Sequence, residues 1–180
     1  MKRKRQTPQE INAKLRGGHN ENSCAVKAEY KNQVWCWDFT MDETAEVRGL
    51  KWFQCWTSSR GGCLALEVER RMKAKDIVAI LTWLEAKRGA PDAIRSDNGP
   101  EFVARAVQKW LAARKVAALY IAPGSPWENG YSESFNSRMK ADFADREVFG
   151  SLLEAKVLGA EYKRLWNRAV AQRNHVQDDD

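Results

Sequence analysis

The stretch Ile94-Arg-Ser-Asp-Asn-Gly-Pro-Glu-Phe102 decides the fold expected for this chain. Its first residues continue a short strand that begins at Asp92, and the next four, Ser96 to Gly99, have the composition of a turn. Pro100 suits the first position of a helix, and apolar residues then recur at helical spacing as far as residue 114. The sequence therefore predicts a strand, a turn and a helix in succession, with Asp97 in the turn.

The residues on either side extend this pattern to a whole domain. In residues 34–40, Trp35, Trp37 and Phe39 alternate with polar or small residues, which predicts a strand with Asp38 on the face opposite the aromatic rings. Further strands are expected at 63–68 and 117–121, and helices at 74–88, 129–145 and 151–170. Strands first, followed by helices and strands in alternation, indicate an α/β domain with a mixed sheet.

The composition excludes several classes of protein. The 180 residues include 30 basic and 24 acidic side chains, and the net charge of +6 fits a polyanionic partner. No apolar run reaches the length of about 18 residues that a membrane-spanning helix needs. The 4 cysteines have no metal-ligand spacing and there are only 2 histidines, which argues against a Cys/His zinc site and a Ser-His-Asp triad. We expect reduced thiols in a cytosol.

Three acids lie at the ends of predicted elements or in a predicted helix: Asp38, Asp97 and Glu133, with the 35 residues 98–132 between the last two. In the predicted helix 129–145, Tyr131, Phe135, Met139 and Phe143 recur every four residues and form an apolar stripe. Glu133 lies about 200° round the helix from that stripe, so we expect it to face a surface or a cleft. Judged by spacing alone, an exposed acid on an amphipathic helix is the more ordinary explanation.

Three stretches carry a resemblance to a known family. They are Val34-Trp-Cys-Trp-Asp-Phe39, the stretch 94–102, and Pro123-Gly-Ser-Pro-Trp-Glu-Asn-Gly-Tyr-Ser-Glu-Ser-Phe-Asn136. In this order, and over residues 27–167, the chain resembles the integrase core of bacterial IS-three-type insertion-sequence transposases, within the superfamily of DDE transposases and retroviral integrases. The resemblance implies an α/β, RNase H-like fold, which is a mixed five-stranded sheet with helices on both faces. It also divides the chain into a basic tail or linker (1–33), an integrase catalytic core (34–150), and a C-terminal helix with an acidic tail (151–180).

The family's catalytic triad falls on Asp38, Asp97 and Glu133, which the resemblance implies are both the catalytic residues and the metal ligands. Three carboxylates suit hard divalent cations, so we expect Mg²⁺ or Mn²⁺, with two ions per site. The family's basic residue seven positions after the triad glutamate falls on Lys140. The residues expected to contact DNA are Lys140, Arg138, Asn136, Asn129 and Trp127, although local packing explains Trp127 equally well. Asp42 and Glu101 are interpreted as structural or solvated.

The implied function is metal-dependent DNA strand cleavage and strand transfer. The expected partners are the DNA ends of the element and the target DNA, bound by a homo-oligomer in the cytoplasm or at the nucleoid, with no membrane. Two other functions remain open: an RNase H-like nuclease that only cleaves, and a catalytically inactive DNA-binding remnant. The family's upstream helix-turn-helix part is not found, and the end of the chain departs from the family's usual tail, so a fragment of an element is expected.

One segment departs from the family pattern. Residues 53–62 read Phe-Gln-Cys-Trp-Thr-Ser-Ser-Arg-Gly-Gly, where the family has a strand resembling Leu-Asp-Glu-Phe-Thr-Arg. When the codons of Gln54 to Thr57 are read two bases further on, they must give Met or Val, then Leu, then Asp. The codons of residues 46–53, read in the same frame, permit Gly-Thr-Arg-Leu-Glu-Val-Val-Pro, which resembles the family's hairpin. Our hypothesis is that residues 46–61 are translated out of frame, with ordinary divergence as the alternative. We therefore expect a poorly formed strand beside Asp38, low solubility and low activity.

Overall fold

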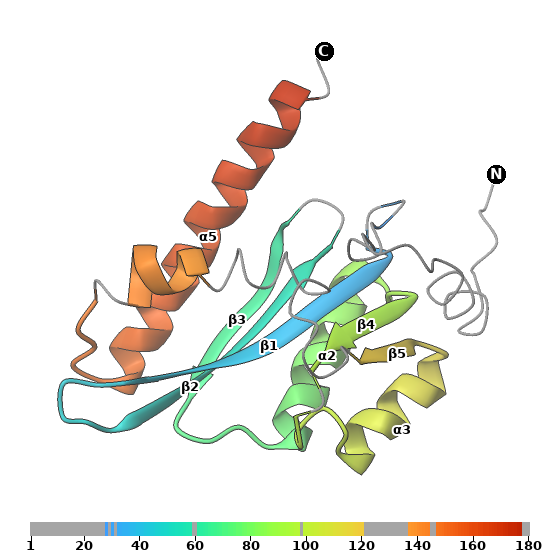
Figure 1. The fold of residues 1–180 in the computed structure, drawn as a ribbon, viewed down its shortest axis with the longest axis horizontal. Coiled ribbons are helices and arrows are strands. Elements are labelled where there is room, and N and C mark those ends of the chain that lie inside the picture. The colour runs from blue at the N-terminus through green and yellow to red at the C-terminus, as the bar shows by residue number, and fades with distance from the viewer. Residues whose placement is uncertain are drawn as a thin grey trace, which may run out of the picture.

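A single mixed sheet of five strands organises the chain. The computed structural model describes residues 28, 30, 32–58, 61–97, 99–120, 137–144 and 147–177. The strands are β1 (Val34–Glu43), β2 (Gly49–Thr57), β3 (Cys63–Glu69), β4 (Ala93–Ser96) and β5 (Ala117–Tyr120), in the spatial order β3-β2-β1-β4-β5. β1, β2 and β3 pair antiparallel, whereas β4 and β5 join β1 in parallel. The predicted mixed five-stranded sheet is confirmed (Figure 1).

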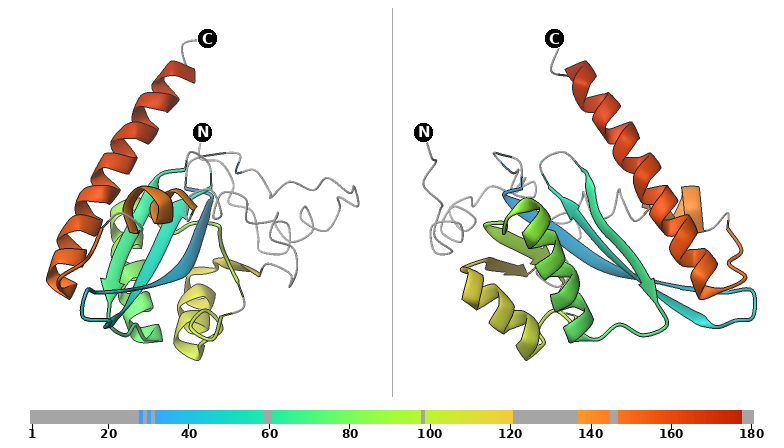
Figure 2. Two further views of the ribbon diagram at one scale, coloured as in Figure 1. Left: turned by 60° about the vertical axis from the view of Figure 1, so that its left-hand side comes forward. Right: turned by 180° about the vertical axis from the view of Figure 1, so that it is seen from behind.

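Helices cover both faces of this sheet, as predicted. α2 (Ala74–Arg88) and α3 (Arg105–Arg114) pack on one face, and α5 (Leu152–Gln177) packs on the other (Figure 2). α2 begins where the Asp76 carboxylate accepts a hydrogen bond from the backbone N–H of Lys73 at 2.8 Å, and it ends at Gly89, whose φ is 79°. The described part of the helix predicted at 129–145 consists of residues 137–139 and a π-helical turn, η2 (Lys140–Ala144).

The alternation along β1 divides the core into two layers. Trp35 and Trp37 pack with Ile77, Leu81 and Leu84 of α2, whereas Val34 and Cys36 belong to the layer under α5. Asp38 follows Cys36 by two residues and so lies on the α5 face, opposite the aromatic rings. This agrees with the arrangement predicted from the sequence.

The segment suspected of being out of frame forms a regular strand. All nine residues of β2 pair with β1, from Gly49 opposite Glu43 to Thr57 opposite Trp35. Trp52, Phe53 and Cys55 are fully buried, with Trp52 in one core layer and the other two in the opposite layer. The expectation of a poorly formed strand beside Asp38 is therefore wrong, because the segment alternates apolar side chains to both faces. The reading frame itself stays a prediction.

Two further expectations are corrected. α3 begins at Arg105 and not at Pro100, because residues 99–103 form a turn closed by the amides of Phe102 and Val103 on the Gly99 carbonyl. This turn lets Phe102 enter the core, where 2% of its surface is exposed. A tryptophan within a helix is ordinarily expected in the core, but Trp83 of α2 has 53% of its surface exposed.

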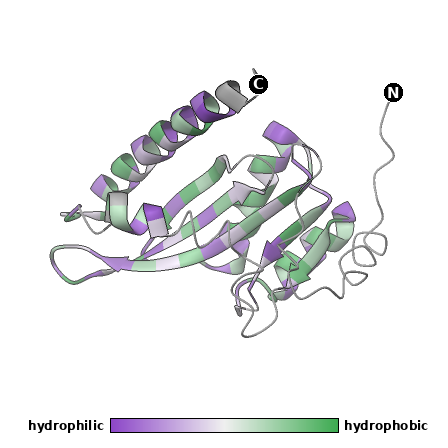
Figure 3. Ribbon diagram, turned by 45° about the horizontal axis from the view of Figure 1, so that its top comes forward, coloured by the Kyte–Doolittle hydropathy of each residue, from purple (hydrophilic) through white to green (hydrophobic). Residues whose placement is uncertain are grey.

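The long C-terminal helix α5 extends beyond the sheet (Figure 1). Hydrophilic and hydrophobic residues alternate along it (Figure 3), since Ala155, Tyr162 and Trp166 face the sheet while charged residues face outward. Its Trp166 indole donates a hydrogen bond to the Gly61 carbonyl at 2.9 Å, and its Asn167 amide bonds both the N–H and the C=O of Cys63. Within the described residues no helix has the length and apolar character to span a membrane.

Candidate active site

Two of the three predicted acids lie just beyond the paired residues of two neighbouring strands, β1 and β4. In the parallel ladder between β1 and β4, Cys36 is the partner of Arg95. Asp38 lies two residues beyond Cys36, and Asp97 lies two residues beyond Arg95, just past the end of β4. Continuing the register therefore brings Asp38 level with Asp97 on neighbouring chains, which are about 4.8 Å apart in a sheet.

Asp38 belongs to the sheet face under α5, and Asp97 follows β4 at a position of matching parity. Cys36 and Ala93 are members of the core layer that includes Met139, Phe143 and Ala155. Because side chains alternate along a strand, Asp38 follows Cys36 onto this face, and Asp97 follows Ala93 at an even spacing. Residues 137–144 pack on that face, so the end of the predicted helix 129–145 lies over the same side as the two acids.

Asp38 is half-buried, and its ladder partner Gln54 contacts the helical segment 137–144. Its Oδ1 accepts a hydrogen bond from the N–H of Phe39 at 2.7 Å. Its partner across the ladder to β2 is Gln54, whose Nε2 donates to Thr40 Oγ1 at 2.6 Å and lies 3.2 Å from Met139 Sδ. Met139 is fully buried, so residues 137–144 are seated next to Asp38 through Gln54.

Asp97 is exposed in a turn that aromatic packing holds. Its Oδ1 accepts a hydrogen bond from the N–H of Gly99 at 3.0 Å, and a Cβ at position 99 would lie 3.0 Å from the same oxygen. Phe102 then stacks on Trp37, with ring centroids 5.0 Å apart, and on Phe39 at 5.3 Å. The glycine thus allows the turn to close tightly around the carboxylate, and Phe102 anchors its far end in the core.

The remaining predicted site residues divide into two groups. Arg138 and Lys140 are exposed, whereas Met139 and Phe143 of the predicted apolar stripe are buried. Glu133, Asn136, Asn129 and Trp127 lie outside the described residues, as do Tyr131 and Phe135 of the stripe.

The donor atoms of the described acids fit a hard divalent cation. Asp38 and Asp97 offer carboxylate oxygens, which are the ligands that Mg²⁺ and Mn²⁺ prefer. Within the described ranges no group of three His, Cys, Asp or Glu residues comes together. The three described cysteines, Cys36, Cys55 and Cys63, are buried free thiols. Burial raises the pKa of Cys36 to about 11 and that of Cys63 to about 12, so both thiols are protonated at neutral pH.

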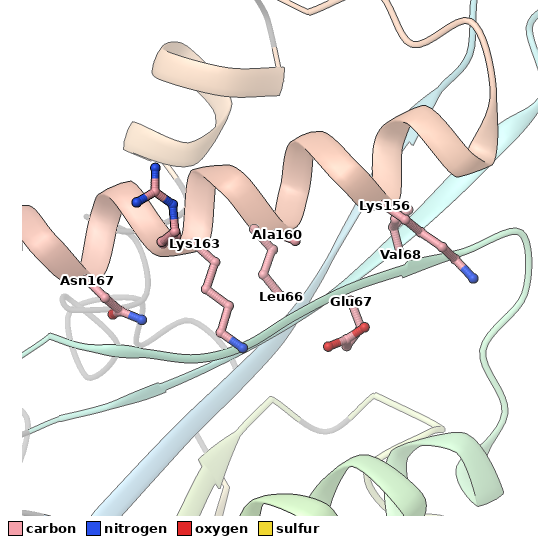
Figure 4. A pocket seen from close by; sticks show the side chains of 8 residues that line it. Leu66, Glu67, Val68, Lys156, Ala160, Lys163 and Asn167 are labelled. Atoms are coloured by element: carbon pink, nitrogen blue, oxygen red, sulfur yellow. The ribbon is translucent and has the colours of Figure 1, made fainter.

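A separate hollow of about 360 Å³ lies between β3 and α5, away from the acid pair (Figure 4). Leu66, Val68 and Ala160 contribute apolar surface, and the Lys163 side chain extends from α5 toward the strand. Burial raises the pKa of Glu67 at its edge, although Lys163 and Lys156 oppose that shift. This hollow contains no member of the predicted site.

Sequence reasoning missed two polar residues of β2, Lys51 and Gln54. Lys51 pairs with Glu101, and Gln54 is the ladder partner of Asp38. A signal was present, because both are polar positions in an otherwise apolar run, Leu50 to Trp56. It was overlooked because that run was interpreted as an out-of-frame segment. Glu101 is structural, as predicted.

Comparisons with known proteins agree with this architecture. Two family models, both described as integrase core domain, match residues 28–126 and residues 114–175. An uncharacterized protein of insertion element IS476 from Xanthomonas euvesicatoria is 31% identical over 148 residues, which are 82% of this chain and 43% of the relative. An uncharacterized protein of insertion element IS407 from Burkholderia multivorans is 30% identical over 144 residues, which are 80% of this chain and 51% of the relative. The chain thus spans about half the length of these curated relatives.

Solved structures share the fold at low sequence identity. The simian T-cell lymphotropic virus intasome, in complex with a regulatory subunit of PP2A, gives a TM-score of 0.62 at 18% identity, covering 74% of this chain and 49% of that one. The Mos1 transposase catalytic domain with raltegravir and magnesium gives 0.58 at 18% identity, covering 78% of both chains. These similarities show an RNase H-like fold, with the strand order and the helix layers described above.

Proposed function

Since the chain belongs to the integrase core domain family, we propose that it is the catalytic core of an insertion-sequence transposase that cleaves DNA and transfers strands. The observation that carries the proposal is that Asp38 and Asp97 each lie two residues beyond the last pair of the ladder between β1 and β4, with residues 137–144 packed over the sheet face of Cys36 and Ala93. Glu133, six residues before Met139, would supply the third carboxylate.

In this proposal Asp38, Asp97 and Glu133 would hold Mg²⁺ or Mn²⁺, two ions per site. When bound, such ions polarise a phosphodiester and stabilise the charge that develops during displacement. The protein's own contribution is to fix the carboxylates on rigid elements: Asp38 within β1, and Asp97 at the end of β4. Without a cation, carboxylates this close repel one another, so the site favours cation uptake.

The exposed cations following the proposed third acid would bind DNA. Arg138 and Lys140 lie on the outer side of the segment whose inner side, Met139 and Phe143, is buried. An exposed cation can contact a phosphate without loss of packing, and each such contact makes binding weaker as salt rises. Asn136, Asn129 and Trp127 are proposed as further DNA contacts, with DNA ends and target DNA as partners of a homo-oligomer. The division into tail, core and C-terminal helix stays part of the proposal.

Product analysis distinguishes this function from the alternatives. The purified chain is incubated with Mn²⁺ and labelled DNA carrying the inverted repeats that flank its gene. Joined products support a transposase, cleavage without joining supports an RNase H-like nuclease, and DNA binding without either supports an inactive remnant. Glu133→Gln is expected to abolish both reactions while leaving the melting temperature unchanged. The matched control is Asp42→Asn, which removes a carboxylate from the same face of β1 four residues away.

A further inference from the structure

We infer that Lys51 is a positioning residue for Asp97, acting through Glu101 to hold the turn that carries this acid. The inference rests on the proposed function, and neither residue was assigned a role in it. Lys51 lies on β2, two strands away from β4, so its side chain ties the turn to a part of the sheet that the β4 ladder does not reach.

The contact itself is unusually well protected. Lys51 Nζ donates a hydrogen bond to Glu101 Oε1, and the two side chains are only 17% and 25% exposed. Lys156–Glu69 is more exposed, at 43% for both side chains, and Arg114–Glu85 is slightly more exposed, at 28% for both. A sheltered pair is screened less by water and salt, so it holds its geometry better than a surface pair does.

Lys51 also contacts the ring on which the aromatic anchor of the turn, Phe102, is stacked. Its Nζ lies 4.1 Å from the centre of the Phe39 ring, and Phe39 stacks on Phe102. Lys51 is therefore linked to two consecutive residues of the turn, directly to Glu101 and through Phe39 to Phe102. The Phe102 N–H bonds the Gly99 carbonyl at 3.0 Å, and the Gly99 N–H bonds the Asp97 carboxylate. A continuous series of contacts therefore runs from Lys51 to Asp97.

The turn needs such support because Asp97 lies just outside the ladder. β4 ends at Ser96, and Asp97 is exposed. A carboxylate that binds a cation has to be held within about 0.5 Å of its working position. The hydrogen bond from Lys51 also lowers the pKa of Glu101, which keeps this carboxylate charged and paired at neutral pH.

The inference conflicts with one consequence of the reading-frame hypothesis. The family-like reading Gly-Thr-Arg-Leu-Glu-Val-Val-Pro puts a valine where this chain has Lys51. Restoring that reading would remove the ammonium group from Glu101 and from the Phe39 ring. Both hypotheses can therefore be tested at the same position, with opposite expectations for the order of the turn.

The test uses the full chain as Lys51→Met, which keeps the apolar stem, and Lys51→Arg, which keeps the charge. The control is Lys156→Met, which breaks the ion pair to Glu69 on β3. Hydrogen exchange of the Gly99, Phe102 and Val103 amides is measured without metal, and Mn²⁺ affinity is measured by calorimetry. Lys51→Met is expected to speed exchange at these amides about tenfold. It is also expected to weaken Mn²⁺ binding about tenfold, whereas Lys51→Arg and Lys156→Met stay near the wild type.

The outcomes separate the inference from the proposed function. Unchanged exchange at the turn in Lys51→Met overturns the inference, whatever the metal does. Faster exchange with unchanged Mn²⁺ affinity also overturns it, because Lys51 would then order the turn without positioning a ligand. If the wild type binds no Mn²⁺, the proposed function fails on its own, and the positioning role fails with it.

Discussion

Asp38 and Asp97 each lie two residues beyond Cys36 and Arg95, the last pair of the parallel ladder between β1 and β4. One of them lies inside a strand that runs on to Glu43, and the other lies in a turn just after a strand of four residues. The two acids are therefore held by different means. The ladder fixes Asp38, whereas packing of Phe102 and the Lys51–Glu101 pair hold the turn of Asp97.

Mutations can distinguish the role of the buried side chains of residues 137–144 from that of the exposed ones. Phe143 is 5% exposed and packs on Trp52, Phe149 and Tyr162, so Phe143→Ala is expected to cost about 3–5 kcal/mol of stability. Arg138→Ala is expected to change stability by less than about 0.5 kcal/mol but to weaken DNA binding and reduce its salt dependence. Urea denaturation and DNA titrations at two salt concentrations measure both. Equal loss of stability in the two variants would contradict the orientation of this segment.

The hairpin between β1 and β2 contains a strained residue. Val47 has φ of 56° and is 74% exposed, and a β-branched side chain is unfavourable in this left-handed conformation. Val47→Gly is therefore expected to stabilise the protein by about 1 kcal/mol, because glycine adopts this φ without strain. Val47→Ala, which keeps a Cβ, serves as the control and is expected to recover less. A lower melting temperature in Val47→Gly than in the wild type would show that the turn is not strained.

Gly159 of α5 packs directly against Trp52. A Cβ at position 159 would lie 2.6 Å from the indole ring, so Gly159→Ala is expected to destabilise the protein by about 1–3 kcal/mol. The loss should outweigh the helix-propensity gain of about 1 kcal/mol for alanine over glycine. Combining the change with Trp52→Val should reverse its sign, because the ring is then absent. Thermal unfolding of the four proteins in this cycle measures the coupling, and additive effects would rule out the contact.

The Lys51–Glu101 pair predicts a specific pH dependence. The pKa of Glu101 is lower in the folded protein than its ordinary value of 4.5, so the folded state binds this proton less readily than the unfolded state. The stabilisation is therefore complete above the ordinary pKa and is lost as pH falls through the folded value. Glu101→Gln should be less stable than the wild type at neutral pH, and the difference should shrink below about pH 4. A difference in melting temperature that stays constant across this range would exclude the pair as its source.

The sequence patterns predicted four of the five strands, all but β2, and the two faces of β1, because period-two and helical patterns determine which side chains are buried. The helix 74–88 was predicted with its observed bounds, and β1 was placed with Asp38 on the correct face. The start of α3 was misplaced because Pro100 tolerates a turn as readily as a helix, and packing of Phe102 on Trp37 and Phe39 decides between them. Such contacts between distant segments have no local signal.

The supporting residues of the site were beyond prediction for a different reason. Lys51 and Gln54 act across strands, through Glu101 and Met139, and sequence spacing does not show which strands are neighbours. The departure of residues 46–61 from the family pattern was also mistaken for loss of structure. β2 instead shows that an apolar run of the right length can complete a sheet whichever reading frame it came from.

The reading frame is decided by the nucleotides. A family-like reading in the second frame from Glu46 onward would support two compensating one-base changes, and its absence would remove the hypothesis. The strained backbone at Val47 agrees with a segment whose present reading frame was never under selection. The Lys51–Glu101 contact instead favours a segment that was selected in this frame. Solubility and activity of a frame-repaired chain would show which effect dominates.

Calorimetric titration of Mn²⁺ tests the central claim most directly, because it asks whether Asp38 and Asp97 share a cation. The wild type is compared with Asp38→Asn, Asp97→Asn and the control Asp42→Asn, each checked for an unchanged melting temperature. The account predicts saturable binding in the wild type and in Asp42→Asn, and loss of that binding in both of the other variants. Equal Mn²⁺ affinity in all four proteins, or loss in Asp42→Asn alone, would contradict it.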